Sequence, residues 1–162
     1  GVAGMPQVVF YRNFDEPTVV FDKPITAEDL ATAVRANSRP RLIEMTEATA
    51  PQIFDNDLPK LLLFRPEAAL AEFKKASDDM ELRGHFIFAT VGEEGDPGLG
   101  DFLGVDKAGT APELFLFEHT THKKYRLDGP VSAASIKASA TPFAPALTLF
   151  RPLHLTDLIG SN

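Results

Sequence analysis

The sequence predicts an α/β fold in which a mixed central sheet is flanked by helices. Three runs of consecutive apolar or β-branched residues, each the length of one strand, are separated by segments with helical spacing. Two further strand-like runs follow, separated only by a turn, and a last helical segment ends the pattern. Strands connected through helices are parallel and strands connected by a tight turn are antiparallel, so one sheet must contain both arrangements.

The N-terminal part of the chain predicts a hairpin followed by one helix. Residues 8–11 and 19–21 are short β-branched and aromatic runs with turn chemistry between them. Thr26 is the expected N-cap of the helix, which ends before Pro40 because a residue preceding proline avoids the α region. A hairpin and one helix cannot bury their own apolar faces. Residues 8–37 must therefore pack on the rest of the chain, pair with another copy or stay disordered, and we expect a homodimer, or exchange of this segment, through them.

The rest of the chain alternates strands and helices before ending in a second hairpin and a helix. The expected elements are a strand at 41–45, a short helix at 46–54, a strand at 60–64, a helix at 66–80, a strand at 86–91, a loop at 92–100, a short helix at 101–104, strands at 114–117 and 123–126, and a helix at 132–140. This order is that of the thioredoxin fold. The first hairpin and helix repeat the end of the same order, as if they closed a preceding module.

We therefore divide the chain into three parts. Residues 1–38 form the C-terminal part of one thioredoxin-like module, and residues 39–141 form a complete second module. Residues 142–162, which begin with two prolines in an apolar context, form a linker or tail.

Composition excludes several classes of function. The chain has 162 residues, a net charge of −7 and no cysteine. The acidic balance argues against nucleic-acid binding, and no apolar run approaches the ~20 residues that span a bilayer. Without cysteine the chain has no thiol nucleophile, disulfide or thiolate metal site, and its first residues lack the pattern of a secretory leader.

Three local motifs are weaker candidates for chemistry. His119 and His122 could be metal ligands, but the segment reads as a turn between strands with no third ligand nearby. The acidic loop 93–98 offers oxygens for a hard cation without the spacing of an EF-hand. The glycines of 98–104 do not follow the first strand of a βαβ unit, so a phosphate loop is disfavoured. We expect no metal and no cofactor.

Several segments resemble protein disulfide isomerases, specifically their non-catalytic b-prime domain and the end of the b domain before it. The segments similar to the b-prime domain are residues 40–54, 60–66, 102–105 and 111–114, and residues 9–16 are similar to the end of the b domain. The match to 46–54 is the more specific one. The tail from Pro142 departs from the family, whose last helix usually continues there.

The resemblance implies a hydrophobic pocket for unfolded polypeptide between the first and third helices. Its expected wall consists of Met45, Ala50, Ile53, Phe54, Leu99, Phe102 and Leu103. Met45 and Ile53 could equally be core residues, whereas Phe54 and Phe102 are expected in the pocket because short helices beside loops are seldom fully buried. The resemblance also implies a cis peptide bond before Pro112 and no catalytic residue in this chain.

These implications define the expected function. The chain would be a redox-inactive thioredoxin-fold domain that binds unfolded or partly folded polypeptides or hydrophobic peptides. By resemblance, its parent would be a chaperone and isomerase of the endoplasmic reticulum lumen, with thiol–disulfide exchange in other domains. Two alternatives stay open, namely an acidic, calcium-associated structural protein of thioredoxin-like modules and a module that only docks a partner.

Overall fold

The computed structural model describes residues 6–92, 97–140 and 150–152. In chain order the elements are β1 (Val8–Tyr11), β2 (Thr18–Phe21), α1 (Ala27–Asn37), β3 (Ile43–Glu44), α2 (Ala50–Phe54), β4 (Lys60–Phe64), the 3-10 turn η1 (Pro66–Ala68), α3 (Leu70–Ser77), α4 (Met80–His85), β5 (Ile87–Val91), α5 (Pro97–Leu103), β6 (Glu113–Glu118), β7 (Lys123–Leu127), α6 (Ala133–Ala140) and β8 (Phe150–Pro152).

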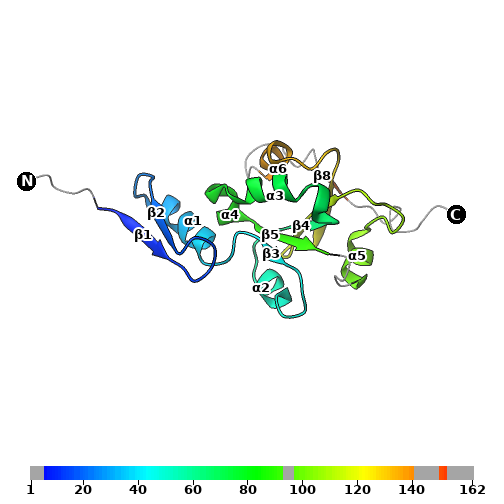
Figure 1. Cartoon of the computed structure of the whole chain (residues 1–162), viewed down its shortest axis with the longest axis horizontal. Helices are drawn as coiled ribbons and strands as arrows, with labels where there is room; N and C mark the ends of the chain where they lie inside the picture. Colours follow the sequence, from blue (N-terminus) through cyan, green and yellow to red (C-terminus); the bar gives the residue numbers. More distant parts are fainter. Residues whose placement is uncertain (1–5, 93–96, 141–149, 153–162) are drawn as a thin grey trace, which may run out of the picture.

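The predicted mixed sheet flanked by helices is confirmed. Six strands lie in the order β3-β5-β4-β6-β7-β8. Strands β3, β5 and β4 are parallel, whereas β6, β7 and β8 each pair antiparallel with the preceding strand in this order. Helices α2 and α5 lie on one side of the sheet, and α3, α4 and α6 lie on the other (Figure 1).

Alternate residues of the central strands separate the core into two apolar clusters. Leu61 and Leu63 of β4 belong to the cluster under α3, α4 and α6, together with Phe73 and Ile136. Leu62 of β4 belongs to the cluster under α2 and α5. The period of two along a strand explains this division, because successive side chains leave opposite faces.

The helix expected at 66–80 is interrupted. Arg65 has a left-handed backbone (φ 50°), the first turn is a 3-10 helix, and α3 ends at Ser77. Asp79 then starts α4 as an N-cap whose side chain accepts from the backbone N–H groups of Glu81 and Leu82. The prediction of one continuous helix was wrong because the N-cap signal of Asp79 was read as helix interior.

Two further expectations need correction. Helix α5 begins at Pro97, within the segment expected to be a loop, and ends before Gly104, whose φ of 79° suits glycine. The peptide bond before Pro112 is trans, since no described peptide bond is cis. The trans isomer is the lower-energy one for most X–Pro bonds, and the Ala111 carbonyl accepts a hydrogen bond from Arg65 Nε at 2.8 Å.

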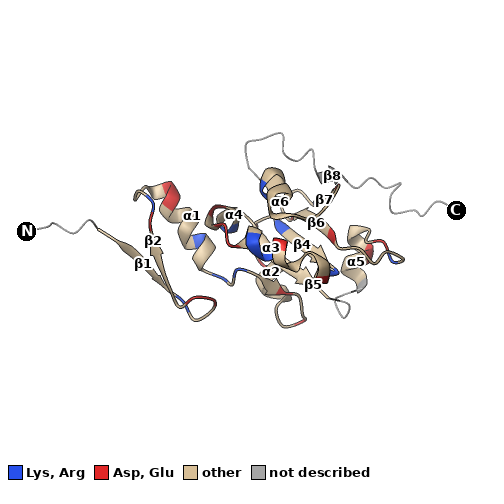
Figure 2. Ribbon diagram, turned by 45° about the horizontal axis from the view of Figure 1, so that its top comes forward, with Lys and Arg blue, Asp and Glu red and all other residues tan. Residues whose placement is uncertain are grey.

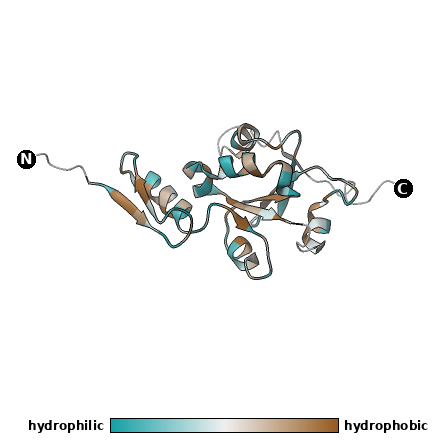
Figure 3. Cartoon of the chain, viewed as in Figure 1, coloured by the Kyte–Doolittle hydropathy of each residue, from teal (hydrophilic) through white to brown (hydrophobic). Residues whose placement is uncertain are grey.

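The N-terminal hairpin and helix dock on the larger sheet domain through α1 and α4. Strands β1 and β2 pair antiparallel as predicted, and Thr26 caps α1 by accepting from the backbone N–H of Asp29. Ala33 and Ala36 of α1 are 1 % exposed. Both strands of the hairpin are hydrophobic (Figure 3), and Tyr11 of β1 remains 82 % exposed. Packing on the rest of the chain, one of the three arrangements considered, therefore occurs, while dimerisation through residues 8–37 stays a prediction.

Candidate functional site

The residues expected to form a polypeptide pocket lie on the α2/α5 side of the sheet, at different depths. Ile53 of α2 and Leu103 of α5 are fully buried in one apolar cluster with Leu62, Phe64 and Phe115. Their side chains support this side of the domain from within and contribute nothing to its exposed surface.

The outer members of the group are only partly buried. Met45, Phe54 and Leu99 pack against the cluster while part of each side chain faces solvent. Ala50, at the start of α2, is also partly exposed. Leu58 packs in the same way, as does Val105, and the sequence reading missed both because they lie in loops. We call this set, together with Phe102, the α2/α5 apolar surface.

Phe102 is the most exposed member of the α2/α5 apolar surface. The residue is 46 % exposed, and its ring packs edge to face on Phe117 of β6 with 5.7 Å between the ring centroids. The ammonium of Lys124 lies 4.1 Å from the centroid of the Phe102 ring and donates to the Phe102 carbonyl. Burial lowers the pKa of Lys124. The ammonium is attracted to the face of the aromatic ring and to the negative C-terminal end of the helix dipole of α5. Both interactions hold Phe102 in place.

Aromatic contacts continue from Phe102 into the turn between β6 and β7. The rings of Phe117 and His119 meet edge to face with 6.3 Å between their centroids, and the rings of His119 and His122 stack with 5.9 Å between theirs. The expected turn at these histidines is confirmed. Within residues 6–92, 97–140 and 150–152, no group of three or more His, Asp or Glu residues could hold a metal ion. Residues 93–96 of the acidic loop lie outside the described residues.

A buried lysine lies beneath α2 at the start of β4. Lys60 is fully buried, and its Nζ donates to the Asn56 carbonyl just after α2. Burial lowers the pKa of Lys60, and repulsion from Arg39 acts in the same direction while Asp57 opposes it. The continuous apolar run predicts a buried strand over 60–64, and the structure extends this burial to the lysine itself, a residue type that is usually exposed.

An ion-pair cluster follows β4, beside the loop that carries Pro112. The buried Glu113 pairs with Arg65 and with Arg126, the second at 3.0 Å. Arg65 also donates to the carbonyls of Asp106 and Ala111 at 2.8 Å each. These residues line a cavity of about 460 Å³. Arg65 thereby attaches the loop between α5 and β6 to the end of β4 through Nε and both terminal nitrogens of its guanidinium.

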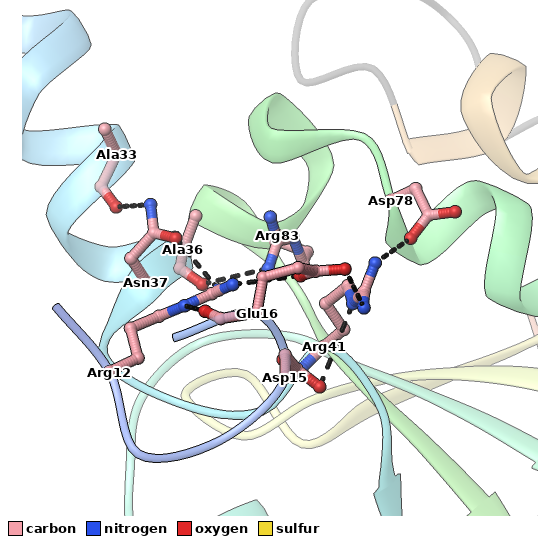
Figure 4. Close-up of polar contacts among 9 residues, drawn as sticks. All are labelled: Arg12, Asp15, Glu16, Ala33, Ala36, Asn37, Arg41, Asp78 and Arg83. Atoms are coloured by element: carbon pink, nitrogen blue, oxygen red, sulfur yellow. Dashed lines mark hydrogen bonds and ion pairs between the residues drawn. The ribbon is translucent and has the colours of Figure 1, made fainter. Parts of the chain in front are cut away.

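A second set of charges joins the hairpin to the sheet domain (Figure 4). Arg41 donates to Glu16 at 2.6 Å and to Asp78 at 2.7 Å, and its backbone N–H donates to Asp15 at 2.7 Å. A hydrogen bond from the backbone, together with Arg41 and Arg12, lowers the pKa of Glu16. Burial acts to lower the pKa of Arg41, but its acidic partners outweigh burial and raise it.

Three more arginines at this junction bond to backbone carbonyls instead of carboxylates. Arg35 donates to the Gly84 carbonyl, Arg39 donates to the carbonyls of Arg83 and Phe86, and Arg83 donates to the Ala36 carbonyl. Burial and the nearby Arg83 and Arg35 lower the pKa of Arg39 to about 10. The accepting carbonyls lie at the C-terminal ends of α1 and α4, where cations are favoured. We therefore assign these arginines a structural role, which is to bond the ends of α1 and α4 to each other.

Charge elsewhere in the molecule is dispersed. Basic residues lie among acidic ones and are not gathered on one element (Figure 2). None of the described helices is both long and apolar enough to cross a membrane. With no cysteine in the chain, the arrangement offers contact surfaces and no thiol chemistry.

Comparison with known proteins agrees with the fold. A family model described as a thioredoxin-like domain matches residues 1–138. The protein disulfide isomerase-like 1-4 of Oryza sativa subsp. japonica is 32 % identical over 152 residues, which are 87 % of this chain and 26 % of that protein. The protein disulfide-isomerase of Oryctolagus cuniculus is 33 % identical over 107 residues, 62 % of this chain and 21 % of that protein. The chain spans between about a fifth and about a quarter of the length of these relatives.

Proposed function

Because this chain belongs to the thioredoxin-like domain family and is similar to protein disulfide isomerases, we propose that it is a redox-inactive module that holds unfolded polypeptides. The module corresponds to a b-prime domain preceded by the end of a b domain. Its parent is a chaperone of the endoplasmic reticulum lumen, and other segments of that parent supply the thiols that this chain lacks.

The exposure of Phe102 carries this proposal. Phe102 is 46 % exposed, is contacted by Lys124, and packs on Phe117, a member of the apolar cluster against which Phe54 of α2 also packs. Exposed apolar residues grouped on one side of a domain are typical of interaction sites. Unfolded polypeptides expose Phe, Leu and Met side chains that such a surface can cover. Each Å² of apolar surface removed from water contributes ~25 cal/mol without requiring a particular sequence.

A flexible methionine beside two aromatic residues favours the binding of polypeptides with many different sequences. Met45 is unbranched and polarizable, so it adjusts to different guests. Phe54 and Phe102 lie on the two helices that border the α2/α5 apolar surface. Reversible capture on this surface would raise the local concentration of a client near catalytic cysteines of the parent.

Peptide binding to single-residue variants tests the proposal. A labelled peptide rich in Phe and Leu is titrated with the native chain, Phe102→Ala and Phe54→Ala, and the fluorescence anisotropy is followed. Each variant should weaken binding by about 5- to 30-fold, because covering part of an aromatic ring contributes about 1–2 kcal/mol.

Tyr11→Ala is the matched control, since Tyr11 is an aromatic residue that is 82 % exposed on the hairpin. Its affinity for the peptide should equal that of the native chain. Equal affinities for all four proteins, or an equal loss in Tyr11→Ala, would overturn the proposal.

A further inference from the structure

The six-stranded sheet ends in a strand that the sequence did not predict. β8 comprises only Phe150, Arg151 and Pro152, and it pairs antiparallel with β7. The register places Phe150 opposite Leu127, Arg151 opposite Arg126 and Pro152 opposite Tyr125. Without β8, the outer edge of β7 would be the edge of the sheet.

β8 can donate only one backbone hydrogen bond to β7. In an antiparallel pair, alternate residues of a strand face the partner with their N–H and C=O groups. If Arg151 faces β7, it supplies one N–H. If Phe150 and Pro152 face β7, only Phe150 supplies an N–H, because proline has none. In both alternations, the described residues 150–152 pair with only part of the edge of β7.

The edge of β7 is also continuous with the α2/α5 apolar surface. Tyr125 and Leu127 pack on the cluster under α3 and α6, so Lys124 and Arg126, which alternate with them, face the α5 side. On that side Lys124 contacts Phe102 and Arg126 pairs with Glu113. The charges of β7 that face α5 are therefore occupied, and every second side chain of a strand added to β7 would lie on the side of Phe102.

We propose that the edge of β7 is a strand-acceptor site for an extended polypeptide segment, which β8 occupies in cis until that segment displaces it. A segment without proline donates more N–H groups to β7 than β8 can. Main-chain hydrogen bonds make such an addition independent of sequence, while alternate apolar side chains meet the α2/α5 apolar surface. The inference deepens the proposed function and rests on it for the identity of the ligand.

Backbone methylation of the ligand tests this site. One Phe- and Leu-rich peptide is made in two methylated forms. The first carries N-methyl groups on the amides of its odd-numbered residues, and the second carries them on the amides of its even-numbered residues. Alternate amides of a strand face its neighbour, so one of the two forms lacks the N–H groups that would bond to β7. The full-length chain should bind one of the two methylated forms about tenfold or more weakly than the unmethylated peptide, because strand addition depends on main-chain hydrogen bonds.

A full-length variant with Phe150→Pro and Arg151→Pro removes every N–H of β8. It should bind the unmethylated peptide a few-fold more tightly, because the competing strand is released. Amide exchange of residues 123–127 should accelerate in this variant and slow again when the peptide is added. Ser161→Pro, a proline substitution at another tail position, is the control and should behave as the native chain.

The outcomes separate the two proposals. Equal affinity for all three peptides with no change of exchange in β7 overturns the strand-acceptor site, even where Phe102→Ala weakens all three. Loss of binding on methylation with full affinity in Phe54→Ala and Phe102→Ala overturns the apolar surface instead.

Discussion

The ammonium of Lys124 on β7 lies 4.1 Å from the centroid of the Phe102 ring on α5. This contact joins the outermost long strand of the sheet to the end of a short helix, and together with Phe117 it holds an exposed aromatic residue in place. Lys124 therefore connects the two surfaces that we assign to polypeptide binding.

Ile53→Ala and Leu103→Ala should destabilise the domain, in contrast to Phe102→Ala. Both side chains are fully buried, so truncation leaves a cavity and should lower the free energy of unfolding by about 2–5 kcal/mol. Phe102 is 46 % exposed, so its truncation should cost clearly less. Urea unfolding followed by circular dichroism measures the difference, and an unchanged midpoint in Ile53→Ala would contradict the packing described for α2.

Gly84→Ala should loosen the contact between α1 and α4. A Cβ at Gly84 would lie 2.3 Å from Thr32 Cγ2 and 2.9 Å from the Thr32 carbonyl oxygen. Relief of this clash requires a backbone shift, and overpacking of this kind costs about 1–3 kcal/mol. Amide exchange in α1 should accelerate. Gly92→Ala, where a Cβ would meet no atom within 4 Å, should leave the exchange of α1 unchanged.

Arg41→Gln should weaken the attachment of the N-terminal hairpin. The substitution removes the charge that pairs with Glu16 on one side and Asp78 on the other. Amides of residues 8–37 should exchange faster in the variant, and added salt should have less effect on it than on the native chain, whose pairs are screened. Lys107→Gln removes the ion pair with Asp101, away from the junction, and serves as the control. Faster exchange in both variants would show that the effect is not specific to the junction.

Asp79→Asn should destabilise the protein in a pH-dependent way. Burial acts to raise the pKa of Asp79, but hydrogen bonds from Lys137 and from the backbone N–H groups of Leu82 and Glu81 outweigh it and lower the pKa. A carboxyl with a lowered folded-state pKa stabilises the protein above its unfolded value of about 3.9, and this contribution is lost as the pH falls through the folded-state pKa. Asparagine keeps the N-cap, so the variant isolates the charge.

Unfolding of this variant is best measured from about pH 7 down to about pH 2, the range over which the carboxyl titrates. The variant should be less stable than the native chain at neutral pH, and the two curves should converge in acid. Glu47→Gln, which changes an exposed carboxyl before α2, is the matched control. A stability difference that is the same at every pH would exclude the ion pair with Lys137 as its source.

Much of the fold follows from local sequence signals. The hairpin 8–21, the N-cap Thr26, the buried strand Lys60–Phe64 and the stop at Gly104 all depend on neighbouring residues and appear as predicted. The sequence predicted only part of the candidate site, because it did not show which apolar residues are exposed. Ile53 and Phe54 are adjacent in one helix, yet the first is fully buried and the second is partly exposed.

The amino-acid sequence by itself determined the α/β class, most of the strand and helix order and the absence of thiol chemistry, because periodicity and composition are properties of short windows. The break between α3 and α4 and the strand β8 were not predicted. Tertiary structure alone decided which apolar residues stay exposed, that Arg41 bridges the hairpin to Asp78, and that β8 pairs with β7. These features join residues far apart in the chain. Their formation depends on which surfaces the folded domain leaves free, which no short window records.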